Sequence, residues 1–379
     1  MGKEQVMKEE KITNSQYMFL IVGYLQGCVL ILSFMDSTAK QDAWIIIVLS
    51  ALIAVPIVLA FAYLAKWFPD KNFFGICRLV YGRVAGKIIT GLYILFFLIV
   101  LSFNIRDLAD FYTNFIMPET PGILFMIIFM LVAAYALKKG MASVAKVSLY
   151  ACVYTFIAIA LIFLLLIRNM DFSNFLPMFE LPADVFIRAT SHFVMVPFCE
   201  LVFFLMMMPV VKSKEKLGRY TIWAVMIGTV SFIATTIRNT AVLGPSSSTV
   251  DFSSYQSVRL INIGEFFTRV ELLTALGLTI TLFIKVCVLF YASVKGISQF
   301  TGMESYTPLL LPVGAIAVIL ARITYDSTIS HFEFALQYNV PLFAPFYAFL
   351  PLLTLLVARL RRLNPNKRKI NLTECKGKV

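Results

Sequence analysis

The fold of this chain is decided by two stretches, Gly23-Tyr24-Leu25-Gln26-Gly27-Cys28 and Phe193-Val194-Met195-Val196-Pro197-Phe198-Cys199-Glu200. Each lies inside an apolar run, and each carries residues that interrupt a helix. The first holds two glycines four positions apart, with the polar amide of Gln26 between them. In the second, Pro197 lacks a backbone N–H and disfavours helical geometry at Val196. We therefore expect two membrane helices that are broken in their interior.

The rest of the sequence predicts further membrane helices. Hydrophobic residues make up 60% of the 379 positions and charged residues only 14%, which is unlike a soluble domain. Apolar runs of ~20 residues suit α-helices that cross the hydrocarbon core. Apolar windows and helix breakers predict an all-α protein with about ten spans, near 14–35, 43–65, 86–108, 121–138, 144–168, 184–210, 219–243, 264–300, 306–325 and 341–361.

The distribution of basic residues predicts the orientation of these spans. The net charge is +12, but Lys and Arg are spread between the spans, which argues against a nucleic-acid partner. Most of them fall on the side that holds the N-terminus, so the positive-inside rule places both termini in the cytosol. The basic segment after the last span predicts a contact with anionic membrane lipids.

Two halves of five spans predict an inverted repeat, because an odd number of crossings turns the second half over. We expect one transmembrane bundle at 1–363, with repeat one at 12–168 and repeat two at 184–361, followed by a cytosolic tail at 364–379. The broken stretches then lie in the first helix of each half. In transporters built this way, half-helix ends and bare backbone groups at such breaks bind a small solute.

The matching breaks predict a binding pocket between the halves. Isolated Glu200 must be paired, hydrated or protonated at this depth. Its roles left open are a structural hydrogen bond at the break, recognition of a solute amine, and proton handling. Glycines four apart also fit a packing face, and a proline kink can occur without a site. The candidate substrate-binding residues are Gly23, Gln26, Gly27, Tyr93, Phe193, Pro197 and Glu200.

Lys285 is a second charge inside an apolar span, and its ammonium needs a carboxylate or carbonyl partner. It acts either as a structural counter-charge or in solute or ion coupling. His192, which precedes the sixth-helix break, is interpreted as a satisfied polar residue. The sequence has no Gly-rich phosphate loop, GxSxG turn or HExxH helix, and its six cysteines include no CxxC pair. We expect neither an enzyme nor a bound cofactor or metal.

Two stretches carry a resemblance to a known family. They are Lys11-Ile12-Thr13-Asn14-Ser15-Gln16 and Arg259-Leu260-Ile261-Asn262-Ile263-Gly264-Glu265-Phe266-Phe267-Thr268-Arg269-Val270-Glu271, which enters the eighth helix and continues to Phe283-Ile284-Lys285 and Tyr291-Ala292. With these stretches the chain resembles the B subunits of endospore germinant receptors. The resemblance implies the broken-helix, LeuT-like fold of the amino acid, polyamine and organocation transporter superfamily. It also implies a place in the spore inner membrane beside an A subunit and a lipoprotein C subunit.

Three functions remain in view at this point. The resemblance favours a receptor subunit that binds a small nutrient, such as an amino acid, and triggers germination when the bundle shifts between two arrangements. The same pocket would also serve a secondary transporter that couples a solute such as an amino acid to H⁺ or Na⁺. A bundle that opens continuously would act as an ion-conducting channel subunit.

Overall fold

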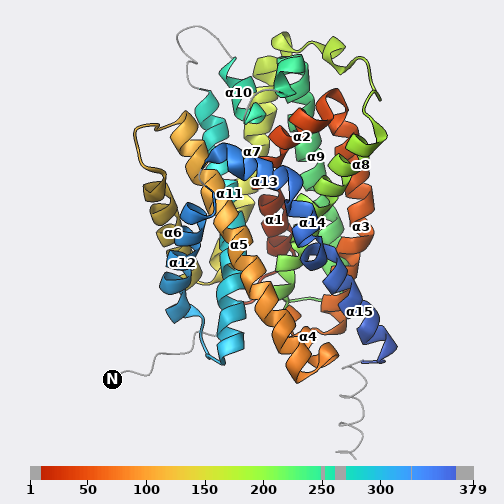
Figure 1. Cartoon of the computed structure of the whole chain (residues 1–379), viewed down its shortest axis with the longest axis vertical. Helices are drawn as coiled ribbons and strands as arrows, with labels where there is room; N and C mark the ends of the chain where they lie inside the picture. The colour runs from red at the N-terminus through yellow and green to blue at the C-terminus, as the bar shows by residue number, and fades with distance from the viewer. Residues whose placement is uncertain (1–9, 249–251, 261–269, 326, 364–379) are drawn as a thin grey trace, which may run out of the picture.

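The computed structural model describes residues 10–248, 252–260, 270–325 and 327–363, and these form a bundle of helices (Figure 1). The predicted tail at 364–379 and residues 261–269 of the stretch that carries the family resemblance lie outside the described residues. Among the described residues, seven helices are long and apolar enough to cross a membrane, and Gly122–Lys138 and Thr307–Ile323 are shorter apolar helices. The protein is an integral membrane protein.

The first span consists of two helices, α1 (Asn14–Gln26) and α2 (Ile31–Ala39). A capping box starts α1: the Thr13 hydroxyl accepts from the Gln16 N–H, and the Gln16 side chain accepts from the Thr13 N–H. Between the two helices, the N–H groups of Cys28 and Val29 bond to carbonyls three residues earlier, so the backbone leaves α-helical geometry. The break predicted beside Gly27 is confirmed.

The sixth span is also broken, over a longer stretch. It begins as α8 (Ala183–Phe193), passes through one π-helical turn at Val194–Phe198, and continues as a 3₁₀ helix at Cys199–Met206. Inside the π turn, Val196 is extended with φ −121° and ψ 113°, and the Val196–Pro197 peptide bond is cis. The break predicted at Pro197 is confirmed.

The remaining helices surround these two spans (Figure 1). A parallel bridge joins Ile12, just before α1, to Val211, just after the sixth span, so these two chain segments meet at one end of the bundle. The elements are α3 (Ala43–Trp67), α4 (Phe73–Tyr81), α5 (Arg83–Phe115), α6 (Gly122–Lys138), α7 (Met141–Leu166), α9 (Leu217–Leu243), α10 (Ser253–Arg259), α11 (Glu271–Thr301), α12 (Leu310–Ile323), α13 (Thr328–Gln337), α14 (Asn339–Ala344) and α15 (Leu350–Leu360).

Three short helices, α4, α10 and α13, fall in segments that the sequence analysis treated as connections. Each is far shorter than the ~20 residues that mark a membrane span, so a search for apolar windows passes over it. The third span is longer than predicted: α5 covers Arg83–Phe115 instead of 86–108. Its last turns contain the ion pair Arg106–Asp110, whose side chains are both 9% exposed.

Candidate functional site

A buried ion pair lies where the broken helices meet. The Glu200 carboxylate, in the 3₁₀ helix after the sixth-span break, lies 3.0 Å from the Lys285 ammonium in the middle of α11. Glu200 is 3% exposed and Lys285 is 4% exposed. A buried charge is costly unless it is paired and hydrogen-bonded, and each of these two residues supplies the partner that the other requires.

Three further side chains surround the Glu200 carboxylate. The hydroxyl of Tyr24 and the thiol of Cys28, both in the first span, donate to Oε2 at 3.3 and 3.6 Å. The hydroxyl of Tyr347, in the tenth span, donates to Oε1 at 3.2 Å. The Lys285 ammonium also lies 5.5 Å from the centre of the Tyr24 ring, within range of a cation–π contact. The carboxylate therefore links both halves of the chain.

The absence of a side chain at Gly27 allows α11 to approach the first-span break. A Cβ at this position would lie 2.7 Å from the Thr281 carbonyl oxygen and 3.0 Å from the Lys285 Cβ. Backbone cannot yield as the end of a flexible side chain can, so α11 would have to move. Gly27 thus serves close packing and at the same time leaves Lys285 beside the break.

A central cavity of about 100 Å³ opens from the ion pair. This is room for several water-sized molecules or for a small solute. Its lining comes from both broken spans, α5, α11 and the tenth-span region: Gly27, Cys28, Leu30, Ile31, Phe34, Val100, Phe103, Asn104, Asp107, His192, Val196, Glu200, Lys285, His331, Phe334, Asn339 and Tyr347. The cavity is therefore mostly apolar, with a few polar and charged groups converging on it, as small-molecule sites usually are.

A second set of charges borders this cavity from α5 and α13. The His331 Nδ1 lies 3.6 Å from an Asp107 oxygen and 3.9 Å from an Asp110 oxygen. Arg106 binds the other Asp110 oxygen at 2.7 Å and donates to the Tyr325 carbonyl at 2.9 Å. His331 is also stacked on the Tyr325 ring at 4.7 Å. These contacts fasten α13 to the third span at one wall of the cavity.

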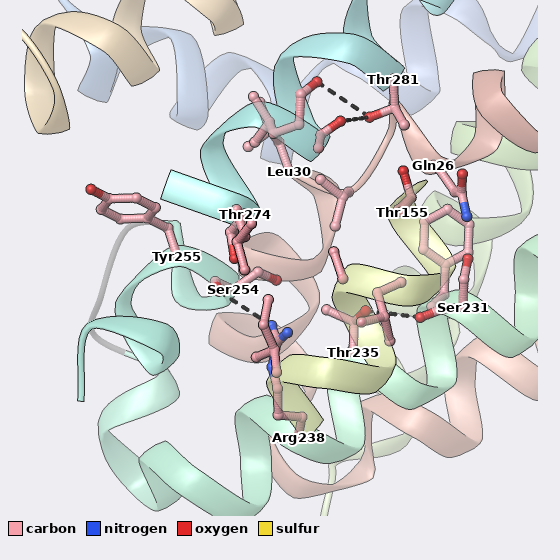
Figure 2. A pocket seen from close by; sticks show the side chains of 18 of the residues that line it. Gln26, Leu30, Thr155, Ser231, Thr235, Arg238, Ser254, Tyr255, Thr274 and Thr281 are labelled. Atoms are coloured by element: carbon pink, nitrogen blue, oxygen red, sulfur yellow. Dashed lines mark hydrogen bonds between the residues drawn. The ribbon is translucent and has the colours of Figure 1, made fainter. Parts of the chain in front are cut away.

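A second cavity, of about 70 Å³, lies beside the first-span break and is bordered by α7, α9, α10 and α11 (Figure 2). Gln26 lines it, is 4% exposed, and has no hydrogen-bond partner for either side-chain atom among the described residues. The hydroxyls of Thr155, Thr235 and Thr281 each donate to a carbonyl of their own helix, so their oxygens remain as acceptors. Leu30 lines both cavities.

The structure brings together only some of the residues proposed from sequence. Gly27, Glu200 and Lys285 line the central cavity, whereas Gln26 lines the second one. Gly23 lies against α11, where a Cβ would meet the Ile284 Cδ1 at 2.9 Å.

Three others lie outside the linings of both cavities. Tyr93 donates to the Phe346 carbonyl at 2.8 Å within a cluster of aromatic rings. Phe193 packs edge to face on Phe198 and Phe232. Pro197 follows Val196, which does line the central cavity.

Sequence reasoning did not select several residues of the central site. Tyr24 and Cys28 stand four positions apart, so a helical reading places them on one face. His192 was interpreted as a satisfied polar residue. It lines the cavity and packs against Phe34, with ring centres 4.2 Å apart and the rings tilted by 37°. The remaining members, Asp107, His331 and Tyr347, come from distant segments and carry no local signal.

A family model and several similar proteins all point to one protein family. A family model described as spore germination protein matches residues 11–329. Spore germination protein KB of Bacillus subtilis (strain 168) is 25% identical over 370 residues, which cover 96% of this chain and 98% of that protein. Spore germination protein YndE of the same organism is 23% identical over 370 residues, covering 93% and 97%. Spore germination protein XB of Bacillus anthracis is 20% identical over 323 residues, covering 85% and 89%.

Two solved structures with the same fold are transporters. Mhp1, a nucleobase-cation-symport-1 family transporter in a closed conformation with bromovinylhydantoin bound, matches with a TM-score of 0.67 and 13% identity, covering 89% of this chain and 77% of that one. A substrate-bound, outward-open Na⁺-coupled sialic acid symporter matches with a TM-score of 0.61 and 14% identity, covering 89% and 79%. The predicted LeuT-like bundle, with about ten spans and broken helices one and six, is confirmed.

Proposed function

Because this chain belongs to the family of spore germination proteins, we propose that it is the membrane subunit of a nutrient-germinant receptor, the B subunit, which binds a small nutrient such as an amino acid in its central cavity and triggers germination. The observation that carries the proposal is the buried pair Glu200–Lys285 inside that cavity. The relatives of this chain are germination proteins rather than enzymes, and we assign the chain no catalytic role.

The ion pair suits a zwitterionic solute. An amino acid carries one ammonium and one carboxylate, so it can face Glu200 with the first and Lys285 with the second. No buried charge is then left without a partner, which is the condition for a tolerable cost in a dry site. A solute with only one charged group would leave one member of the pair unsatisfied. The site should therefore prefer amino acids over derivatives that have lost either charge.

The same contacts give a route from binding to signalling. Glu200 is held by Tyr24 and Cys28 of the first half and by Lys285 of α11. A solute that enters between these groups replaces contacts that join the broken helices to α11. It binds one arrangement of the bundle better than the other and so shifts the population. The A and C subunits would read this shift.

The candidate residues divide by role under this proposal. Gly27 and Glu200 contact the solute, and Lys285 takes its carboxylate. Gln26 faces the second cavity and contributes through the first-span break. The other four candidates contribute to packing or hydrogen bonding at and around the breaks: Gly23, Tyr93, Phe193 and Pro197.

The test compares spores with wild-type protein and with Glu200→Gln at equal protein abundance. Germination is recorded against concentration for a panel of amino acids, and for the N-acetyl and methyl ester forms of those that act. We expect the intact amino acid to act and both derivatives to fail, and Glu200→Gln to raise the concentration required at least tenfold. Equal potency of the derivatives, or an unchanged response curve for Glu200→Gln, would contradict the proposal.

The likeness to symporters favours a second candidate, a secondary transporter for the same solute. Full-length protein in sealed vesicles, supplied with a labelled amino acid and an H⁺ or Na⁺ gradient, separates the two. Accumulation that needs only this chain identifies a transporter. Binding without accumulation, together with copurification of the A and C subunits from spore membranes, identifies the receptor subunit.

We further propose that the protein lies in the spore inner membrane with both termini in the cytosol. The native Cys28, Cys77, Cys152, Cys199 and Cys287 are buried, so labelling of introduced cysteines is readable once Cys375 is replaced by Ser. Glu119, between α5 and α6, and Lys138, at the other end of α6, are both exposed. An impermeant thiol reagent should label Glu119→Cys in intact cells and Lys138→Cys only after permeabilisation. The reverse pattern would overturn the orientation.

A further inference from the structure

A sharp elbow joins α4 to α5. Gly82 takes a positive φ of 86° between the two helices. A Cβ at Gly86 would lie 2.7 Å from the Arg78 Cα and 3.0 Å from the Cys77 carbonyl oxygen, so α4 lies directly against the backbone of α5. This contact holds Arg78 beside the first two turns of α5, at the end of the bundle where α4 is seen in Figure 1.

The elbow borders a basic cavity of about 640 Å³. Its cations are Lys71, Arg78, Arg83 and Lys87, and all four are exposed. The lining residues include no Asp or Glu, and none of the four cations forms an ion pair with another described residue. Lys87 lies 5.0 Å from the centre of the Phe300 ring at the end of α11. The cavity thus concentrates positive charge that the described protein does not neutralise.

Acidic residues near the elbow do not change this balance. Asp70 precedes Lys71 in the chain but does not line the cavity, and its carboxylate interacts electrostatically with Lys214. The amino end of α5, a helix that runs Arg83–Phe115, adds the positive end of its dipole to the same place. An anion is the ligand that such a cavity suits.

An exposed apolar stripe runs along α5 and begins in its first turn, which also carries Arg83 of the cavity lining. Val84 is 74% exposed, Ile88 60%, Leu92 46% and Leu95 59%. Spacings of four, four and three residues place these side chains on one face of the helix. The stripe starts one residue after Arg83, which is about 100° further around the helix. Positive charge and exposed apolar surface therefore adjoin, as the headgroup and acyl chains of a lipid do.

We infer that the α4–α5 elbow is a binding site for an anionic phospholipid, with its phosphate among Arg78, Arg83 and Lys87 and an acyl chain along the stripe of α5. Arginines bind phosphate through two parallel hydrogen bonds, and basic pockets between membrane helices hold the headgroups of anionic lipids. A free phosphate would use the cations but not the stripe. The inference is independent of the nutrient proposed for the central cavity.

The test uses full-length, delipidated protein in a nonionic detergent. Native mass spectrometry measures the binding of phosphatidylglycerol and of phosphatidylcholine with the same acyl chains. Each cation near a membrane surface contributes on the order of fivefold in affinity, so Arg78→Gln with Lys87→Gln should weaken phosphatidylglycerol binding on the order of thirtyfold. The charge-preserving pair Arg78→Lys with Lys87→Arg should lose much less, and an equal loss would show that charge does not determine binding.

A matched control removes the same charge elsewhere. Lys138 and Lys139 are exposed, and Lys139 lies over the Tyr135 ring at 5.5 Å, but neither borders the elbow cavity. Lys138→Gln with Lys139→Gln should leave phosphatidylglycerol binding unchanged. An equal effect of the two pairs, or equal binding of phosphatidylcholine and phosphatidylglycerol, would overturn the site.

A fourth pair of substitutions separates lipid from free phosphate. Ile88→Ser with Leu92→Ser should weaken phosphatidylglycerol binding while leaving the weak competition by inorganic phosphate or glycerol phosphate unchanged. If the stripe variant binds phosphatidylglycerol as the wild type does, and inorganic phosphate displaces the lipid at equal concentration, the cavity holds free phosphate and the lipid assignment is wrong.

Discussion

The two broken spans differ in what breaks them. In the first span, four irregular residues lie between α1 and α2, and the α11 backbone comes so close that a Cβ at Gly27 would lie 2.7 Å from the Thr281 carbonyl oxygen. In the sixth span, Pro197 lies inside the irregular turn and Val196 is extended. The first break thus depends on a neighbouring helix and the second on its own residues. The first break should therefore be sensitive to side-chain volume at Gly27. The second break places Glu200 in the bundle, and the bundle should be sensitive to the charge of that side chain.

The largest expected effect comes from removing the partner of that charge. Lys285→Met leaves the Glu200 carboxylate buried without its cation, which should cost about 3–5 kcal/mol of stability. Adding Glu200→Gln should recover most of this loss, because no unpaired charge remains. Thermal unfolding of the purified single and double variants measures both quantities. Lys139→Met serves as an exposed control, and additive losses in the double variant would show that the pair does not interact.

Side-chain volume at the first break should have the next largest effect. Gly27→Ala places a methyl group against the α11 backbone and should cost about 1–3 kcal/mol through overpacking. It should also raise the nutrient concentration needed for germination. Gly23→Ala is the matched control, because its Cβ would meet side-chain atoms instead of backbone, the nearest being the Ile284 Cδ1 at 2.9 Å. Equal unfolding temperatures for the two variants would show that the approach of α11 does not hold the first break.

Two tyrosines allow a finer comparison of the groups that hold Glu200 from the first span and from the tenth. Tyr347 is the described donor to Glu200 Oε1, whereas Tyr24 shares Oε2 with Lys285 and Cys28. A hydrogen bond to a charged group contributes about 1.5–3 kcal/mol, so Tyr347→Phe should approach that loss and Tyr24→Phe should lose less. Unfolding temperatures rank the two variants. A greater loss for Tyr24→Phe would place the stronger hold on Glu200 in the first span.

The fold could be predicted from the sequence to the extent that its causes are local. Apolar runs mark membrane helices because bilayer thickness fixes their length, and Pro197 marks a break because its missing N–H acts on its own turn. The amphipathic helix α4, which buries Phe73, Ile76 and Val80 among others, was not predicted because it is only nine residues long.

The site was less predictable, because its members meet through tertiary structure. Glu200 and Lys285 were each recognised as buried charges that need a partner, but nothing in their sequence spacing pairs them. The direction of the Tyr93 side chain could not be predicted. Its burial among aromatic rings depends on the rotation of α5 about its axis, which hydropathy leaves undetermined in a span that is apolar on all sides.

Leu30 stands in the short segment between α1 and α2 and borders both cavities. A rotamer change that moves its side chain toward one chamber removes volume there and adds it to the other. A solute that pushes Leu30 aside to fill one cavity would therefore leave less room in the other. Any occupant of the central cavity that displaces Leu30 alters the free energy of filling the second cavity, and by reciprocity an occupant of the second alters the affinity of the first by the same factor.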